Sequence, residues 1–255
     1  MDSYEERRIR LGVNRREPRG VAGHRDATHD QQERRRQSAE KEDEDSMTTT
    51  ISDEVIGASR ALVVREAEGV AAVAGLVGDE SFREVVGTLL GMTGKVITAA
   101  SGTSGMMARR LAHLLSVCGT PALFLDPTTG LHGSLGATAP GDVVIALSKG
   151  GGTGELTEFA SRAKQRGATV IAITCRDASP LVDAADQVVV VPAGEGDPGG
   201  AIAMGSTLVM AAWGDAVAYA LMQLRGYSWE DFLFTHPLGN VGERADEILS
   251  ENQDR

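Results

Sequence analysis

The strongest constraint on the fold is an alternation of short apolar runs with longer amphipathic segments. The runs that we expect to form strands are residues 96–100, 122–125, 143–147, 170–174 and 187–191. Runs that are apolar throughout are typical of strands buried on both faces, and intervening helices bring successive strands into parallel alignment. The sequence therefore predicts an α/β fold with a parallel sheet covered by helices on both faces.

Helical periodicity is found at residues 52–77, 80–90, 104–117, 154–166, 180–185 and 202–224. In the first of these segments Val55, Ile56, Leu62, Val63 and Val70 fall on one side, which predicts an amphipathic helix. No repeat is evident at the period of a solenoid protein.

Residues 1–46 lack the apolar content that a folded core needs. The basic run at 34–36 is closely followed by the acidic run at 42–45, so the charges nearly cancel. A nucleic-acid-binding arm would carry such a basic run, but the neighbouring acids favour a solvated tail. We therefore predict a disordered charged tail at 1–46 and a globular domain at 47–255, with Met47 as a candidate translation start.

Composition excludes several functional classes. The net charge of −11 disfavours non-specific binding to DNA or to anionic membranes. Aromatic residues make up only 4% of the chain, which argues against an aromatic-lined surface for nucleic acid. Cys118 and Cys175 have no metal-ligand spacing, so we expect neither a metal nor a cofactor. Apolar stretches fall short of a membrane span, no export signal is visible, and the low cysteine count fits a reducing compartment. We expect a cytoplasmic protein.

Two loops at expected strand ends combine hydroxyl groups, glycines and a following helix. The first is Ser101-Gly102-Thr103-Ser104-Gly105, and the second runs from Ser148 through Lys149, three glycines and Thr153 to Gly154-Glu155. Glycine allows the backbone to approach an anion, and the amides at a helix N-terminus attract negative charge. Two such loops at adjacent strand ends favour a phosphate ligand.

A nucleotide cofactor is the alternative to a phosphate ester at these loops. Gly94-Lys95 lacks the hydroxyl residue and glycine spacing of a P-loop. The turn at 100–105 approximates a dinucleotide-binding turn, and Asp126 lies where a ribose-binding acid is expected. That interpretation leaves the long hydroxyl-rich loop at Ser148 without a role, so we do not favour it.

Four side chains are candidates for acid–base chemistry: Glu155, Glu195, His236 and His132. Each also has a structural interpretation. Glu155 could simply complement the dipole of the helix that it begins, and Glu195 could be a solvated acid in a glycine-rich loop. His236 suits a helix cap, and His132 suits a turn. Taken singly, none of the four indicates catalysis.

The motifs taken together resemble the SIS (sugar isomerase) domain family, and most closely its arabinose-5-phosphate isomerase branch. The resemblance covers about residues 55–242 and rests on the segments 101–105, 119–121, 132–136, 141–146, 148–155, 214–216, 231–232 and 236–239. The last of these, His236-Pro237-x-Gly239 after a short helix, is the most specific.

The resemblance implies a three-layer αβα sandwich with a five-stranded parallel sheet, in a homodimer or homotetramer with sites at subunit interfaces. It also implies site residues. Phosphate-binding positions are Ser101, Thr103, Ser104, Ser148, Gly150 and Thr153. Catalytic positions are Glu155, Glu195 and His236, with His132 lining the site.

The sequence departs from the family pattern at both phosphate loops. Thr103 stands where the first loop normally carries a lysine, and Lys149-Gly150 replaces the Asn-Ser of the second loop. We therefore expect Lys149 to supply the phosphate-binding cation that the first loop lacks. The family's paired CBS domains do not follow within the 255 residues.

The expected reaction is aldose–ketose isomerisation of a sugar phosphate through an enediol. Glu155 or Glu195 would move the proton between the carbons, and His236 would serve the oxygens or ring opening. The sequence does not choose between the glutamates. A non-catalytic phosphosugar sensor and an amino-sugar-phosphate lyase or etherase remain as alternatives.

Overall fold

The computed structural model describes residues 51–252. The expected charged tail at 1–46 and the expected start of the domain at 47 lie outside these residues. Residues from Asp53 onward form one compact unit.

The core of this unit is a sheet of five parallel strands in the order β2-β1-β3-β4-β5. The strands are β1 (Val96–Ala99), β2 (Ala122–Phe124), β3 (Val143–Leu147), β4 (Thr169–Thr174) and β5 (Gln187–Val190). Val96 of β1 lies opposite Ala122 on one side and opposite Val143 on the other, so β1 and β3 are neighbours. The predicted parallel sheet and its five strand positions are confirmed.

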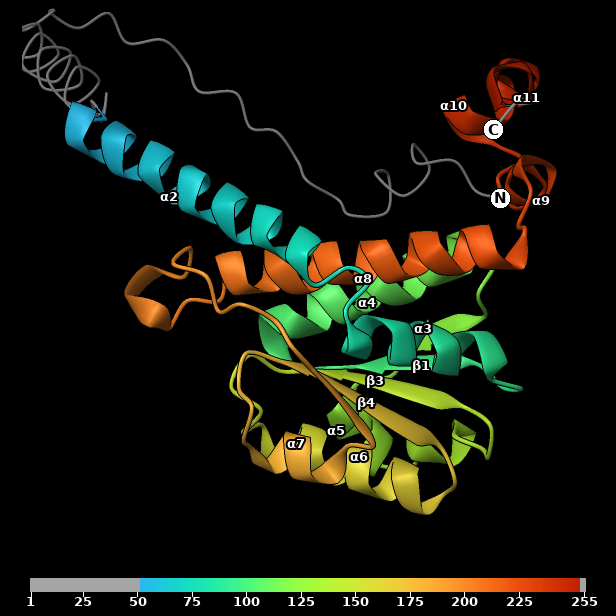
Figure 1. Cartoon of the computed structure of the whole chain (residues 1–255), viewed down its shortest axis with the longest axis horizontal. Helices are drawn as coiled ribbons and strands as arrows, with labels where there is room; N and C mark the ends of the chain where they lie inside the picture. Colours follow the sequence, from blue (N-terminus) through green and yellow to red (C-terminus); the bar gives the residue numbers. More distant parts are fainter. Residues whose placement is uncertain (1–50, 253–255) are drawn as a thin grey trace, which may run out of the picture. The chain divides into compact units, whose positions relative to one another are not determined.

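Helices cover both faces of the sheet (Figure 1). On one face lie α3 (Glu80–Gly91), α4 (Gly102–Val117) and α8 (Gly205–Arg225). On the other lie α5 (Pro127–Leu131), α6 (Gly154–Gln165) and α7 (Pro180–Ala184). Strand side chains alternate between the two layers, with Val143 and Ile145 facing the first and Val144 and Ala146 facing the second. Because both faces are covered, the strands are predominantly apolar.

Helix α8 packs along the centre of the first layer. Its Trp213 is fully buried and meets the ring of Phe82 edge-on at a centroid distance of 6.1 Å. Within residues 51–252, α8 is the one helix whose length and composition would suit a membrane span, which the sequence analysis did not anticipate. A core helix satisfies the same criterion, and Val217 and Leu221 are buried among the core side chains.

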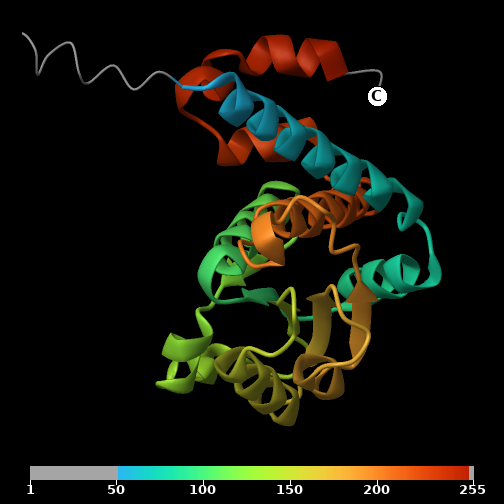
Figure 2. The same ribbon diagram turned by 90° about the vertical axis from the view of Figure 1, so that its left-hand side faces the viewer.

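The first and last helices lie outside the sheet layers. Helix α2 (Asp53–Ala72) contacts α8, yet none of its residues is buried. The apolar side expected for it is therefore largely uncovered, and Val55 and Val63 are more than half exposed. After α8 come α9 (Trp229–Thr235), α10 (Gly239–Glu243) and α11 (Ala245–Asn252), also without buried residues. Figure 2 shows these elements on the side of α8 away from the sheet.

The start of the long helix and the presence of one short helix differ from expectation. The long helix begins at Gly205 and not at 202, because the Asp197 carboxylate accepts hydrogen bonds from the Met204 and Ser206 amides and fixes the first turn there. The short helix α5 was not predicted, although Asp126 caps it and Pro127 begins it, a common N-terminal signal.

Candidate functional site

The two hydroxyl- and glycine-rich loops lie side by side at the carboxyl edge of the sheet. Residues 100–101 follow β1 and lead into α4, whereas residues 148–153 follow β3 and lead into α6. Since β1 and β3 are adjacent parallel strands, both loops and both helix N-termini share one edge. This is the edge where ligands bind in open parallel sheets.

The first loop turns tightly into α4. Gly102 has a φ of 59°, a left-handed conformation that glycine adopts without strain. Ser101 is the N-cap of α4, but its side chain makes no capping hydrogen bond. Thr103 is exposed and Ser104 half-buried in the first turn. The Ser101 hydroxyl and the first-turn amides of α4 thus lie together at the sheet edge.

The second loop is organised around the buried side chain of Ser148. The Ser148 Oγ accepts a hydrogen bond from the Gly151 amide at 3.1 Å and lies 3.4 Å from the Thr153 Oγ1. Gly151 has a φ of 64°, and a β-carbon there would run into Ser179. Gly150 is exposed at the tip, and the Thr153 side chain, at the N-cap of α6, makes no capping hydrogen bond. The loop therefore has a fixed shape and a free helix N-terminus.

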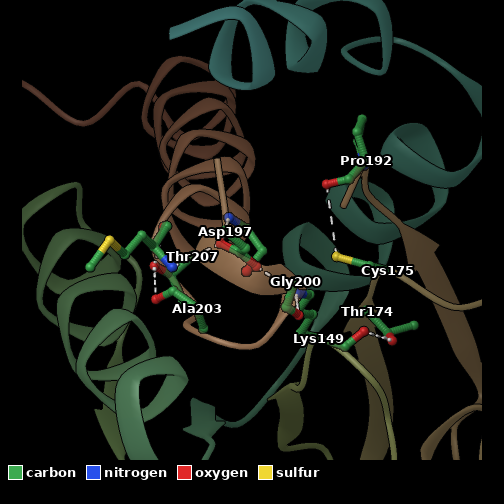
Figure 3. Close-up of polar contacts among 10 residues, drawn as sticks. Lys149, Thr174, Cys175, Pro192, Asp197, Gly200, Ala203 and Thr207 are labelled. Atoms are coloured by element: carbon green, nitrogen blue, oxygen red, sulfur yellow. Dashed lines mark hydrogen bonds and ion pairs between the residues drawn. The ribbon is translucent and has the colours of Figure 1, made fainter. Parts of the chain in front are cut away.

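The ammonium group of Lys149 is already engaged by protein groups (Figure 3). Its Nζ forms an ion pair with the Asp197 Oδ2 at 2.6 Å and donates a hydrogen bond to the Gly200 carbonyl at 2.7 Å. The backbone carbonyl of Lys149 accepts hydrogen bonds from the Cys175 amide and the Thr174 hydroxyl. Both ends of the residue are held, and the expected phosphate-binding role of Lys149 stays a prediction.

Asp197 is buried and ionised. Burial alone would raise the pKa of its carboxyl, but hydrogen bonds from Lys149, Ser206 and Met204 outweigh that effect and lower the pKa to about 2. Nearby, the Cys175 thiol contacts the Pro192 carbonyl at 3.8 Å, and burial raises its pKa. At neutral pH this corner of the site holds a carboxylate and a protonated thiol.

The two candidate glutamates lie at the same edge of the sheet. Glu155 is exposed in the first turn of α6, directly after the Ser148 loop. Glu195 is exposed two residues before Asp197, and its carbonyl accepts a hydrogen bond from the Arg65 Nε of α2 at 3.2 Å. The backbone at Gly196 packs against Gly205, where a β-carbon would lie 2.8 Å from the Gly196 Cα. The site thus offers two solvated carboxylates, each on an anchored segment.

His132 is exposed at the C-terminus of α5, on the layer that contains α6. The structure places it after the edge strand β2, and no hydrogen bond or ion pair ties it to the two loops. Its predicted role in lining the site stays a prediction.

His236 ends α9, and its ring stacks on Phe232 at a centroid distance of 4.2 Å. Its Nδ1 lies 2.9 Å from the Phe232 carbonyl. A carbonyl only accepts hydrogen bonds, so this contact places a proton on Nδ1.

Within one chain, His236 is remote from the loops. Helix α8 extends from its Asp197 cap for 21 residues, or about 30 Å, to Gly226. At that far end the Tyr227 ring fills the space beside Gly119, which precedes β2 at the amino edge of the sheet. The structure brings the two loops, Lys149 and both glutamates together but leaves His236 at the opposite edge.

An open cavity of about 650 Å³ lies at that opposite end, lined by Tyr219, Met222, Gln223, Gly226, Tyr227, Ser228, Trp229, Glu230, Leu249 and Asn252. None of the residues of the two hydroxyl- and glycine-rich loops and neither candidate glutamate lines this cavity. Within residues 51–252 no cluster of three or more His, Cys, Asp or Glu side chains is placed to hold a metal ion.

Sequence reasoning missed Asp197 as a functional-site residue. The sequence did contain a clue to Asp197, because this residue lies in the same glycine-rich stretch as Glu195, and the stretch leads into the long helix. The partner of Lys149 was invisible in the sequence because 48 positions separate the two residues, and the proximity comes from the order of the strands.

The comparisons with known proteins show the family. The family model for the SIS domain matches residues 90–219, from the end of α3 into α8. The chain belongs to the SIS domain family. The matched region contains both loops, both glutamates and Asp197, but not His236.

Individual relatives share the fold and much of the sequence. Arabinose 5-phosphate isomerase KdsD of Pseudomonas aeruginosa is 36% identical over 70% of this chain and 55% of its own length. Arabinose 5-phosphate isomerase GutQ of Escherichia coli is 33% identical over 76% of this chain and 60% of its own length. The SIS chain thus spans little more than half of these relatives.

A solved structure of a protein from E. coli CFT073, in complex with arabinose 5-phosphate, matches with a TM-score of 0.68 and 31% identity. The match covers 74% of this chain and 100% of that one. The single SIS unit described here therefore corresponds to a whole solved chain.

Proposed function

We propose that this chain is an aldose–ketose isomerase acting on a sugar phosphate similar to arabinose 5-phosphate. The observation that carries the proposal is the pairing of two anchored hydroxyl- and glycine-rich loops with two solvated glutamates at one sheet edge. The names of the KdsD and GutQ relatives and the arabinose 5-phosphate complex of the E. coli CFT073 protein support this substrate class.

The phosphate would bind between the two helix N-termini. Their first-turn amides and nearby hydroxyls are donors, and the helix dipoles favour a dianion there. The proposed ligands are Ser101, Thr103, Ser104, Ser148, Gly150 and Thr153. An acidic protein can hold an anion in this way without a dense basic patch.

The sugar carbons would then lie near the glutamates. One carboxylate removes the proton from C2 of the aldose, an enediol forms, and the same proton or one from solvent is delivered to C1. The hydroxyl proton at O2 moves to O1 in the same cycle, so the reaction is redox-neutral overall. Glu155 and Glu195 are the proposed bases, and neither a metal nor a cofactor enters these steps.

A second copy of the chain would complete the site with His236. One chain places His236 about a helix length from the glutamates, so an intramolecular role would require unfolding of the end of α8. Phe234 and Leu238 flank His236 and are 86% and 84% exposed, which suits burial against another subunit. We propose a homodimer or homotetramer in the cytoplasm, with no nucleic-acid or membrane partner.

The test is interconversion of sugar phosphates by the purified chain. Four- to seven-carbon aldose and ketose phosphates would be incubated with the protein, and products separated by chromatography, with the unphosphorylated sugars as controls. We expect conversion of at least one five-carbon phosphate and none of the free sugars. A rise in melting temperature without conversion would contradict the enzyme and indicate a phosphosugar sensor.

A further inference from the structure

We propose that Asp197 and Lys149 form a positioning strut, in which the Asp197 carboxylate holds the Lys149 ammonium so that the Glu195 loop stays fixed against the Ser148 loop. The inference deepens the proposed function and rests on it for its catalytic consequence. The strut itself is a property of the fold and is measurable without any substrate.

The first support is that Asp197 joins its own glycine-rich loop to two other segments. Its Oδ1 accepts hydrogen bonds from the Met204 amide at 2.8 Å and the Ser206 amide at 3.0 Å, at the start of α8. Its Oδ2 pairs with the Lys149 Nζ at 2.6 Å, in the loop after β3. A single carboxylate therefore ties the first turn of α8 to the loop that is expected to bind phosphate.

The second support is that Lys149 also braces the glycine-rich loop itself. Its Nζ donates a hydrogen bond to the Gly200 carbonyl, three residues beyond Asp197 (Figure 3). Its backbone carbonyl is held by the Cys175 amide and the Thr174 hydroxyl at the end of β4. Lys149 thus spans from β4 to residues 197–200, with both ends fixed.

The third support is burial. The Asp197 side chain is 2% exposed and that of Lys149 is 27% exposed. If the ammonium moved away to a phosphate, a buried carboxylate would lose its counter-ion, which is strongly unfavourable. The low-energy arrangement keeps Lys149 on Asp197 and leaves phosphate binding to the amides and hydroxyls of the two loops.

The consequence concerns Glu195, which lies two residues before Asp197 in an exposed part of the loop. Its segment has two other anchors, the Arg65 hydrogen bond to the Glu195 carbonyl and the close packing of Gly196 on Gly205. Removing the strut would release the loop on the side of the phosphate site. Small displacements of a catalytic group cost large factors in rate.

The experiment compares Lys149→Met, Asp197→Asn and the double variant with the unaltered chain. Native-state digestion with a Glu-specific protease reports on the loop through cleavage after Glu195, identified by mass spectrometry. We expect each single variant to speed this cleavage by about tenfold relative to cleavage after Glu158 in α6. The double variant should be cleaved no faster than the single variants, because each of them already removes the same ion pair. Inorganic phosphate should bind the variants as it binds the unaltered chain.

A matched control is available at the amino edge of the sheet. Lys95 forms an ion pair with buried Asp142 at 2.8 Å and donates a hydrogen bond to the Ala137 carbonyl, and Asp142 also accepts two amide hydrogen bonds. Lys95→Met removes a comparable ion pair, and it should leave cleavage after Glu195 unchanged relative to Glu158.

The catalytic arm measures kcat and KM on whichever sugar phosphate is converted. Lys149→Met should lower kcat by about tenfold or more and change KM by less than about threefold, because a positioning residue acts on the base and not on the phosphate. A Lys149→Met chain with unchanged cleavage after Glu195 would overturn the strut, and at least tenfold weaker binding of inorganic phosphate by that chain would instead assign Lys149 to the phosphate site. If the unaltered chain converts no sugar phosphate, the proposed function fails, whereas the cleavage ratios still decide the strut.

Discussion

At the scale of single residues, the glycine-rich loop places two acids in opposite environments. Asp197 is buried with three hydrogen-bond donors, and they lower its pKa to about 2. Glu195, two residues earlier, is exposed to solvent. An acid held ionised by such partners is a poor base, so Asp197 suits a positioning role and Glu195 a proton-transfer role.

The depressed pKa of Asp197 predicts how stability depends on pH. A carboxyl whose pKa is lower in the folded chain stabilises that chain above its unfolded value near 3.8, and the stabilisation is lost as the pH falls toward 2. We expect Asp197 to contribute about 2 kcal/mol to the free energy of unfolding at neutral pH. Urea unfolding of the unaltered chain and Asp197→Asn measures it. The difference between them should shrink between pH 4 and pH 2, and a constant difference would contradict the assignment.

The proposed bases are tested by removing charge with little change of shape. Glu155→Gln and Glu195→Gln retain the size of the side chain, and the substitution at the true base should lower kcat by about 10²–10⁴-fold. Glu158→Gln is the control, because Glu158 is an exposed residue of α6 paired only with Arg162. Steady-state kinetics with the converted sugar phosphate distinguishes them. Full activity in both Glu155→Gln and Glu195→Gln would exclude a carboxylate base from this loop region.

At the scale of elements, the site depends on how the loops after β3 and β5 leave the carboxyl edge of the sheet. The Ser148 loop owes its shape to the left-handed conformation of Gly151 and to the hydrogen bond between the Gly151 amide and the Ser148 hydroxyl. The loop from Val191 to Met204 owes its shape to the Asp197 cap and to the contact of Gly196 with Gly205. Both depend on backbone geometry more than on side-chain volume.

Gly151→Ala tests the shape of the second loop. Alanine is strained at a φ of 64°, and its β-carbon would run into Ser179. We expect a loss of about 1–3 kcal/mol in the free energy of unfolding, together with loss of phosphate binding. Gly152→Ala is the matched control, because a β-carbon at Gly152 meets nothing within 4 Å. Urea unfolding and titration with inorganic phosphate measure both effects, and equal behaviour of the two variants would contradict the account.

The strands were predictable because each is mostly apolar, and β1, β3 and β4 are buried over almost their whole length. The start of α8 was not predictable from periodicity, since Asp197 fixes it through a cap outside the helix. The two loops that we propose as the phosphate site were recognisable in the sequence by their glycines and hydroxyl groups. The ion pair between Lys149 and Asp197 could not be predicted, because the two residues are distant in the sequence and come together only through the order of the strands.

At the scale of the whole molecule, the chain leaves its candidate catalytic groups at two opposite edges. Glu155 and Glu195 lie at the carboxyl edge, whereas His236 follows α8 to the amino edge. The apolar side of α2 and the residues around His236 are also exposed. These features fit a site shared between two copies of the chain.

Mixing two inactive variants tests the shared site. In a symmetric dimer, a chain with Glu155→Gln and a chain with His236→Ala form one intact site per mixed pair. Random mixing should therefore restore about a quarter of full activity, if Glu155 is the base. Each variant alone should stay inactive, as should a mixture of two separately prepared samples of Glu155→Gln. No recovery after subunit exchange, verified by mass spectrometry, would contradict a shared site.

The most direct test of the central claim is proton exchange at the sugar carbons. The purified chain is incubated in heavy water with arabinose 5-phosphate and related aldose and ketose phosphates, and deuterium is followed by NMR. The account predicts deuterium at C2 of the aldose or C1 of the ketose, together with the isomerised product. Phosphosugar binding with neither exchange at these carbons nor isomerised product would contradict an enediol isomerase.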